Sequence, residues 1–229
     1  LLIISVHRVP LLTKKGYFHA GVLGTILWAC IGWNAWLSVV FYLFLGFLVT
    51  KLGFKQKSSR GIAESRGGKR GPENVWGSAA TGAVLALLFK VSNETYSNLI
   101  LIAFAASFAA KLGDTFGSEI GKRWGANPVL ITSLHPVKPG TDGAISLQGT
   151  IASFIGSTLM SFVMALLSVI PFGYPFIIVS TSGFIATLFE SIIGAVFQAR
   201  FKYLTNEVVN FIQTTISSII AISIFLLVV

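Results

Sequence analysis

The sequence predicts an all-α protein: a polytopic transmembrane helical bundle of about seven spans, in one integral membrane domain over residues 1–229. Of the 229 residues, 54% are hydrophobic and only 11% are charged, whereas a soluble domain carries about 25% charged residues. Long stretches with few or no charges recur along the chain, and a spanning helix needs roughly 20 mostly apolar residues. These stretches are unbroken and do not alternate, so they favour helices over the strands of a membrane barrel.

Seven hydrophobic segments follow one another along the chain, and each is a candidate span. The first two are short, and the residues Gly-Trp-Asn at 32–34 suit a tight connection between them. A single tilted helix over 19–50 is the alternative. The expected spans are residues 17–32, 34–50, 75–90, 97–111, 146–170, 174–198 and 207–229.

Positive charge is unevenly distributed between the loops that these spans define. All but one of the 17 Lys and Arg residues fall on one side, and only Lys90 falls on the other. Most of them lie in a basic loop at 51–74 and in a motif-bearing loop at 111–145. Because cytoplasmic loops carry the excess of Lys and Arg, this side is expected to face the cytoplasm or its equivalent. The net charge of +9 thus indicates topology, and no nucleic-acid partner is expected.

The first candidate site is the segment Gly-Asp-Thr-Phe-Gly-Ser-Glu, which places two of the eight acidic residues after a long apolar run. On a regular helix Asp114 and Ser118 share a face, whereas Asp114 and Glu119 diverge by about 140°. The two carboxylates meet on one ion only if a glycine bends the segment or a substrate phosphate bridges them. Mg²⁺ often binds one or two carboxylates together with waters and phosphate oxygens. The structural alternative is a local ion pair of Glu119 with Lys122 or Arg123.

A second candidate is the loop over 135–150, which is rich in proline and glycine. Gly140 and Gly143 permit close backbone approach, and a helix that begins near Ser146 would point its N–H groups at an anion. Lys138 adds a positive charge. The alternative is an ordinary turn in which Ser146 caps the following helix.

Glu190 is a third candidate, because it lies in the middle of an expected span. A charged side chain at mid-membrane costs about 2.5–3.5 kcal/mol on insertion scales. Glu190 is therefore expected to face a cavity, a partner or a metal ion, or to stay protonated in an interhelical hydrogen bond. Gln198 and Arg200 continue its polar face. Such a track also suits a transporter or channel, but the far loops are nearly bare of ionisable groups, which favours chemistry at one surface.

Two further segments supply polar groups on the same side. In Leu-Thr-Asn-Glu-Val-Val-Asn, Thr205 or Asn206 can cap the last helix. At the end of the basic loop, Asn74 begins a span and is expected to line the site. The functional interpretation of this loop is capture of an anionic headgroup or nucleotide, and the alternative is a solvated loop.

Together, these segments resemble a family of integral membrane proteins of the uncharacterised-domain type. It includes the transmembrane protein 19 group and the phytyl-phosphate kinases of tocopherol synthesis. The first segment looks like the family's Asp-Thr-Phe-(small)-Ser-Glu motif, and Pro-Gly-Thr-Asp-Gly looks like its Pro-Gly-Thr-x-Gly block. Phe-Glu-Ser-Ile-Ile-Gly-Ala-Val-Phe-Gln and Leu-Thr-Asn-Glu-Val-Val-Asn are similar to two further blocks. Order and spacing match over about residues 20–229.

The resemblance implies a lipid phosphate kinase, which is a phosphotransferase. It would move a phosphoryl group from a nucleoside triphosphate, with CTP as one candidate, to phytyl or prenyl monophosphate, giving the diphosphate. The implied setting is a plasma or photosynthetic (thylakoid or plastid) membrane, with Mg²⁺ as cofactor and membrane lipid around the protein. A prenyl-alcohol kinase and a cytidylyl-type transferase are alternatives with the same site and a different acceptor.

The roles implied by the resemblance fall on residues from all of these segments. Asp114, Glu119 and Glu190 are expected to hold Mg²⁺. Lys138 joins them as a catalytic residue that neutralises charge. The residues expected to bind the nucleotide or the lipid phosphate are Asn74, Ser118, Arg123, Gly140, Thr141, Asp142, Gly143, Ser146, Gln198 and Asn206.

Overall fold

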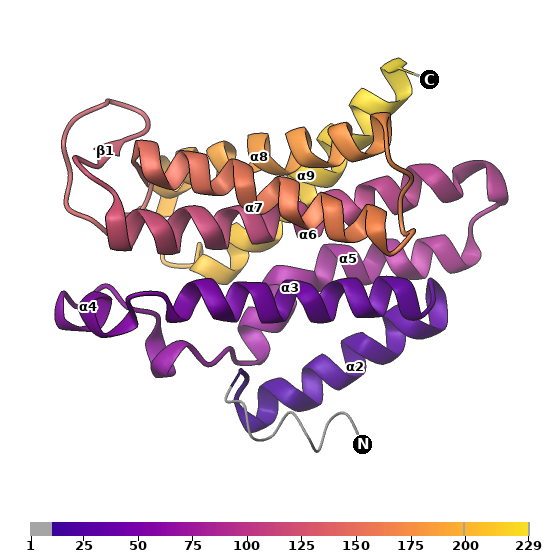
Figure 1. The fold of residues 1–229 in the computed structure, drawn as a ribbon, viewed down its shortest axis with the longest axis horizontal. Helices are drawn as coiled ribbons and strands as arrows, with labels where there is room; N and C mark the ends of the chain where they lie inside the picture. Colours follow the sequence, from indigo (N-terminus) through magenta and orange to yellow (C-terminus); the bar gives the residue numbers. More distant parts are fainter. Residues whose placement is uncertain (1–10, 199, 229) are drawn as a thin grey trace.

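Helices dominate the computed structural model, which describes residues 11–198 and 200–228 (Figure 1). Six of the described helices are long and apolar enough to cross a membrane. A further helix, α2, has 17 residues, which is close to the lower limit of about 17 for a span. The predicted all-α bundle of about seven spans is therefore confirmed. The long helices are α2 (Lys14–Cys30), α3 (Trp33–Lys51), α5 (Pro72–Val91), α6 (Glu94–Trp124), α7 (Leu147–Leu166), α8 (Tyr174–Ile193) and α9 (Asn206–Val228).

Short elements lie between the long helices. A six-residue helix, α4 (Phe54–Ser59), and a 3-10 turn, η1 (Ser65–Gly68), occupy part of the segment predicted as a basic loop. Strands β1 (Val129–Leu130) and β2 (Ala144–Ile145) pair antiparallel and close the motif-bearing loop into a hairpin. At its end α8 continues into a π-helical turn, η2 (Gly194–Gln198).

The first two spans are separate helices, as the Gly-Trp-Asn sequence predicts. Thr13 caps α2, because its Oγ1 accepts a hydrogen bond of 3.0 Å from the N–H of Gly16. Between α2 and α3, Gly32 has a φ of 119°, a conformation that L side chains rarely adopt. The helix ends before this glycine and a new helix begins after it, so the alternative of one tilted helix over 19–50 is wrong.

Helix α6 is longer than the predicted span at 97–111. It continues to Trp124, so the loop predicted at 111–145 begins only at Gly125. The prediction ended the span at Lys111 because a charge in a membrane segment is costly. In the structure this lysine is only 5% exposed and forms an ion pair with Asp114, which offsets its charge.

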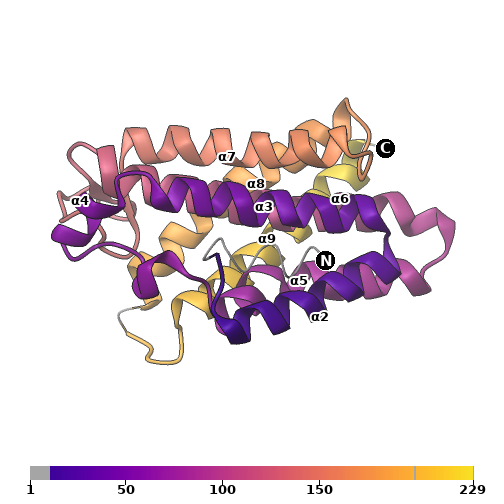
Figure 2. The same ribbon diagram turned by 60° about the horizontal axis from the view of Figure 1, so that its bottom comes forward.

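Helix α6 lies at the centre of the bundle and packs against α3, α5, α7, α8 and α9 (Figure 2). Small residues let α7 approach it closely. A Cβ added to Gly113 would lie 2.9 Å from the carbonyl oxygen of Ser153, and one added to Gly156 would lie 2.9 Å from the carbonyl oxygen of Leu112. Membrane helices commonly pack through such small residues. The glycines of the acidic segment therefore serve packing, and α6 continues through them as a helix without a break.

The connections between helices gather at opposite ends of the bundle. Helix α4 and the β1–β2 hairpin lie at one end, which we call the loop end, and the short α2–α3, α5–α6 and α7–α8 connections lie at the other (Figure 1). Lys90 is in the last turn of α5, away from the loop end. The elements that carry the predicted motifs therefore meet at one end of the molecule.

Candidate functional site

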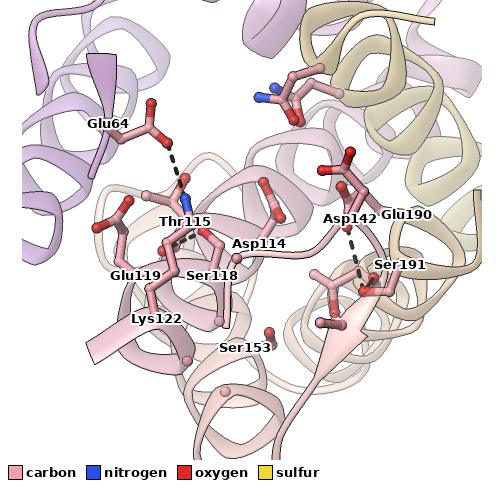
Figure 3. A pocket seen from close by; sticks show the side chains of 18 of the residues that line it. Glu64, Asp114, Thr115, Ser118, Glu119, Lys122, Asp142, Ser153, Glu190 and Ser191 are labelled. Carbon is pink, nitrogen blue, oxygen red and sulfur yellow. Dashed lines mark hydrogen bonds and ion pairs between the residues drawn. The ribbon is translucent and has the colours of Figure 1, made fainter. Parts of the chain in front are cut away.

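A cavity of about 330 Å³, which we call the polar cavity, lies at the loop end (Figure 3). Residues from every predicted motif line it, although these motifs are far apart in the sequence. Among the predicted site residues, Lys138 and Arg123 are the two that do not line it. Those that do are Asn74, Asp114, Ser118, Glu119, Gly140, Thr141, Asp142, Gly143, Ser146, Glu190, Gln198 and Asn206.

Asp114 faces the polar cavity from α6 and is held by a buried lysine. The Nζ of Lys111, one turn earlier on the same helix, donates to the Asp114 carboxylate. It also donates to Oδ1 of Asn210 on α9, at 2.9 Å. These contacts fix the direction of the Asp114 side chain and place a positive charge next to it.

Glu119 belongs to the opposite side of the same stretch of helix. It is 2% exposed and forms an ion pair with Lys57 of α4, which is 1% exposed. Lys57 also donates to the carbonyl oxygen of Thr50 at 2.9 Å. The expected divergence of Asp114 and Glu119 is thus correct. The expected local partner of Glu119 is wrong, because the partner comes from α4 and fastens this short helix to α6.

The proline- and glycine-rich loop is seated on the end of α8. Gly143 has a φ of 74°, and a Cβ there would lie 2.6 Å from the carbonyl oxygen of Ser191 and 2.5 Å from the backbone N of Ala195. This contact falls where α8 passes into the π-helical turn. It brings Asp142 beside Glu190 at the wall of the polar cavity, as Figure 3 shows.

Replacing Gly143 by Ala is expected to destabilise the protein by about 1–3 kcal/mol, because the added methyl group overpacks this contact. The control is Gly173→Ala at the opposite end, where φ is 96° but nothing lies within 4 Å of the added Cβ. Both changes strain a left-handed residue, and only the first creates a collision. Thermal unfolding in detergent measures the difference. Equal losses for the two variants would contradict this description of the loop contact.

The cations at the polar cavity are not those that the sequence predicted. Lys138 is exposed on the hairpin loop, and the guanidinium of Arg123 stacks on Trp124, 4.8 Å from the ring centroid. Arg70, Lys69, Lys111 and Lys122 line the cavity instead. Sequence reasoning missed Lys111 as a site residue, although a lysine that directly continues a long apolar run is a signal for function.

Arg70 is a protonated cation at the wall of the polar cavity. Its Nη1 donates to the hydroxyl of Tyr42 at 2.7 Å. Burial alone would lower the pKa of Arg70, but Tyr42 and the carboxylates of Glu64 and Asp114 outweigh it, so the pKa is raised. The guanidinium therefore stays protonated throughout the physiological range.

Several polar residues at the cavity also hold the local structure together. Ser146 caps α7, because its Oγ accepts a hydrogen bond of 3.2 Å from the N–H of Gly149. The Nδ2 of Asn74 donates to Glu207 at 3.1 Å and so links α5 to α9. Thr205 accepts a backbone hydrogen bond at the start of α9. The structural alternatives predicted for Ser146 and Thr205 are therefore correct, and Ser146 lines the cavity as well.

Asp114 and Glu190 both line the polar cavity from different helices, and Asp114 is paired there with Lys111 (Figure 3). Within residues 11–198 and 200–228, no group of three or more His, Cys, Asp or Glu side chains is placed to hold a metal ion. Because Glu119 is engaged by Lys57, the structure does not form a joint site of Asp114, Glu119 and Glu190. A magnesium ion would need further oxygens from water and a bound phosphate, as such sites commonly have. Magnesium binding stays a prediction.

The fold and the cavity define a class of protein, namely a polytopic helical membrane protein with a polar, acid-lined cavity at one end of its bundle. The chain belongs to the integral membrane protein family DUF92, whose model matches residues 1–218. This assignment confirms the family resemblance inferred from the motifs.

Several relatives are similar to the chain over most of its length. An uncharacterised membrane protein of Synechocystis sp., sll0875, is 47% identical over 98% of this chain and 86% of its own. Protein VTE6, chloroplastic, of Arabidopsis thaliana is 41% identical over 96% of this chain and 68% of its own. An uncharacterised membrane protein of Methanocaldococcus jannaschii is 31% identical over 98% of this chain and 90% of its own. No solved structure matches the chain significantly.

Proposed function

We propose that this protein is a lipid phosphate kinase, which transfers the terminal phosphoryl group of a nucleoside triphosphate to phytyl or another prenyl monophosphate. One observation carries the proposal: the motifs that resemble those of the phytyl-phosphate kinases line a single polar cavity at the end of a membrane bundle. Carboxylates, cations and a glycine-bearing loop meet there, and phosphoryl transfer depends on such positioning and charge neutralisation.

The proposed reaction balances without a proton donor or acceptor. An oxygen of the lipid phosphate attacks the γ-phosphorus of the nucleoside triphosphate and forms a new P–O–P bond. The bond from that phosphorus to the oxygen bridging the β-phosphate breaks, and the nucleoside diphosphate leaves with the bonding electrons. Because the attacking oxygen is already ionised, no strong general base is needed. The protein has to bring two anions together and offset their charges.

The groups at the polar cavity divide this work. In the loop from Gly140 to Gly143, the N–H of Thr141 is hydrogen-bonded to the carbonyl oxygen of Lys138, so the N–H groups of Gly140, Asp142 and Gly143 are those that would bind nucleotide phosphates. Lys111 and Lys122 supply positive charge. Asp114 and Glu190 are the residues that would hold Mg²⁺, whose charge offsets that of the phosphate oxygens.

The proposed setting is a photosynthetic or plasma membrane, with the loop end facing the cytoplasm or its equivalent. Two observations support it. The Lys and Arg residues of the loops gather at the loop end, as they do on the cytoplasmic side of membrane proteins. A relative at 41% identity is named as chloroplastic.

Phosphoryl transfer by the purified protein is the direct test. With Mg²⁺ and each γ-labelled nucleoside triphosphate in turn, phytyl phosphate and farnesyl phosphate are expected to become labelled diphosphates. CTP is the first donor to try. Chromatography of the lipid fraction separates the mono- and diphosphates.

The same assay separates the alternatives. Label entering a monophosphate when the free alcohol is supplied would identify an alcohol kinase instead. If no lipid is labelled with any donor, while liposomes show a nucleotide-independent flux that Glu190→Gln abolishes, the protein is a transporter and the kinase proposal is wrong.

A further inference from the structure

A second, mainly apolar cavity of about 90 Å³ lies between α2, α3 and α5. We call it the apolar groove. Aliphatic side chains form most of its wall, from Leu23 and Leu27 on α2, Val39 and Leu43 on α3, and Ala79 on α5. Ligand pockets commonly have volumes of roughly 300–1,000 Å³, so the groove suits part of one hydrocarbon chain rather than a bulky ligand.

The apolar groove and the polar cavity share part of their walls. Arg70, Asn74 and Ser78 line both of them. The groove is therefore polar at this shared end and apolar along the rest of its length. A molecule with an anionic head and an apolar tail matches this change of surface.

Arg70 has the chemistry to hold the anionic head at the junction. A guanidinium has five N–H donors, and among residues 11–198 and 200–228 the side chain of Arg70 donates one hydrogen bond, to the hydroxyl of Tyr42. Among the described residues, no carboxylate lies within 4.0 Å of this guanidinium, since the ion pairs there involve other cations. The side chain keeps donors available for a phosphate, with which arginine forms bidentate contacts.

The backbone of Arg70 is held firmly against the start of α2. Its N–H donates to the carbonyl oxygen of Leu11 at 3.1 Å, and its carbonyl oxygen accepts from the N–H of Thr13 at 3.0 Å. Its position is thus tied to the helix that forms one wall of the groove.

Trp36, on α3, lines the groove where it meets α2. A Cβ added to Gly24 would lie 3.0 Å from Nε1 of Trp36, so the indole rests directly on this glycine. Trp36 also contacts Trp28 edge to face, with ring centroids 5.3 Å apart. The close contact between Trp36 and α2 thus depends on the absence of a side chain at Gly24, and a larger residue there would push into this wall of the groove.

We propose that the apolar groove binds part of the hydrocarbon chain of a single-chain lipid monophosphate, whose phosphate is held by Arg70 at the junction with the polar cavity. This inference rests on the proposed kinase function and assigns the acceptor its place: α2, α3 and α5 hold the chain, and Asp114 and Lys111 lie beside the phosphate end. A nucleotide then occupies the part of the polar cavity beneath the glycine-bearing loop.

The test fills the groove from α2. Gly24→Leu is expected to raise KM for farnesyl phosphate by about tenfold or more, with kcat and KM for the nucleotide unchanged, as loss of uniform substrate binding predicts. Gly21→Leu is the matched control, because it makes the same change on the same helix where nothing lies within 4 Å of the added Cβ. If Gly24→Leu does not fold, Ala20→Leu fills the same groove.

A binding measurement separates this inference from the kinase proposal. Farnesyl phosphate titrated into wild-type protein is expected to change the tryptophan fluorescence, because Trp36 lines the groove. Arg70→Gln is expected to weaken this binding by about 10- to 100-fold and to leave that of farnesol unchanged. Binding without turnover would remove the kinase proposal and keep the groove. Wild-type affinity in both a folded groove-filling variant and Arg70→Gln would overturn the inference.

Discussion

Asp114→Asn is expected to lower kcat for phosphoryl transfer by about 100- to 1,000-fold, the usual effect of removing one group that stabilises charge in a transition state. Asparagine has the same shape and can still accept the hydrogen bond from Lys111, but it leaves the buried charge of Lys111 without its ion-pair partner, so a loss of stability is expected beside the loss of turnover. Steady-state kinetics on purified protein, with a thermal unfolding curve for each sample, measures it.

Glu94→Gln is the matched control for this prediction. It removes a carboxylate from the same helix, α6, in its first turn at the end away from the polar cavity. Its turnover is expected to equal that of the wild type. Wild-type turnover by folded Asp114→Asn protein would exclude this carboxylate from catalysis and remove the main residue assignment of the kinase proposal.

Glu119→Gln is expected to destabilise the protein by about 3–5 kcal/mol, because it leaves the buried charge of Lys57 without its partner. The double variant Lys57→Met, Glu119→Leu removes both charges and is expected to recover most of the loss. Chemical unfolding in detergent micelles gives the free energies of unfolding of the wild type and both variants.

An exposed ion pair provides the comparison. Arg66 and Glu73 pair at the surface, where their side chains are 42% and 46% exposed, and Glu73→Gln is expected to cost less than about 1 kcal/mol. A similar small cost for Glu119→Gln, or a double variant as unstable as the single one, would show that the pair does not fasten α4 to α6.

The spans could be predicted from the sequence because the membrane imposes a simple length and composition on them. The end of α6 could not be predicted this way. Lys111, Asp114 and Glu119 look like a departure from the membrane, yet Lys111 pairs with Asp114, and two residues far away in the sequence complete the contacts: Asn210 accepts from Lys111, and Lys57 pairs with Glu119. A local sequence pattern does not contain those distant partners, so a prediction from it makes the helix too short.

The candidate site likewise has a part that could be predicted from the sequence and a part that could not. Its motif residues could be found, because glycines, hydroxyls and acids at fixed spacing indicate phosphate chemistry. Its cations could not be identified by proximity in the sequence. Lys138 lies next to the glycines of the loop but is exposed on it, whereas Arg70 reaches the cavity through the contact between its backbone and the start of α2.

The wall that the two cavities share at Arg70 has a consequence for the energetic cost of the proposed reaction. Moving a prenyl chain from lipid into water would cost about 0.8 kcal/mol for each CH₂ group. Where the apolar groove and the polar cavity meet at the guanidinium of Arg70, an oil-soluble acceptor and a water-soluble donor would react without either leaving its preferred solvent. The border between two immiscible phases then lies inside the protein.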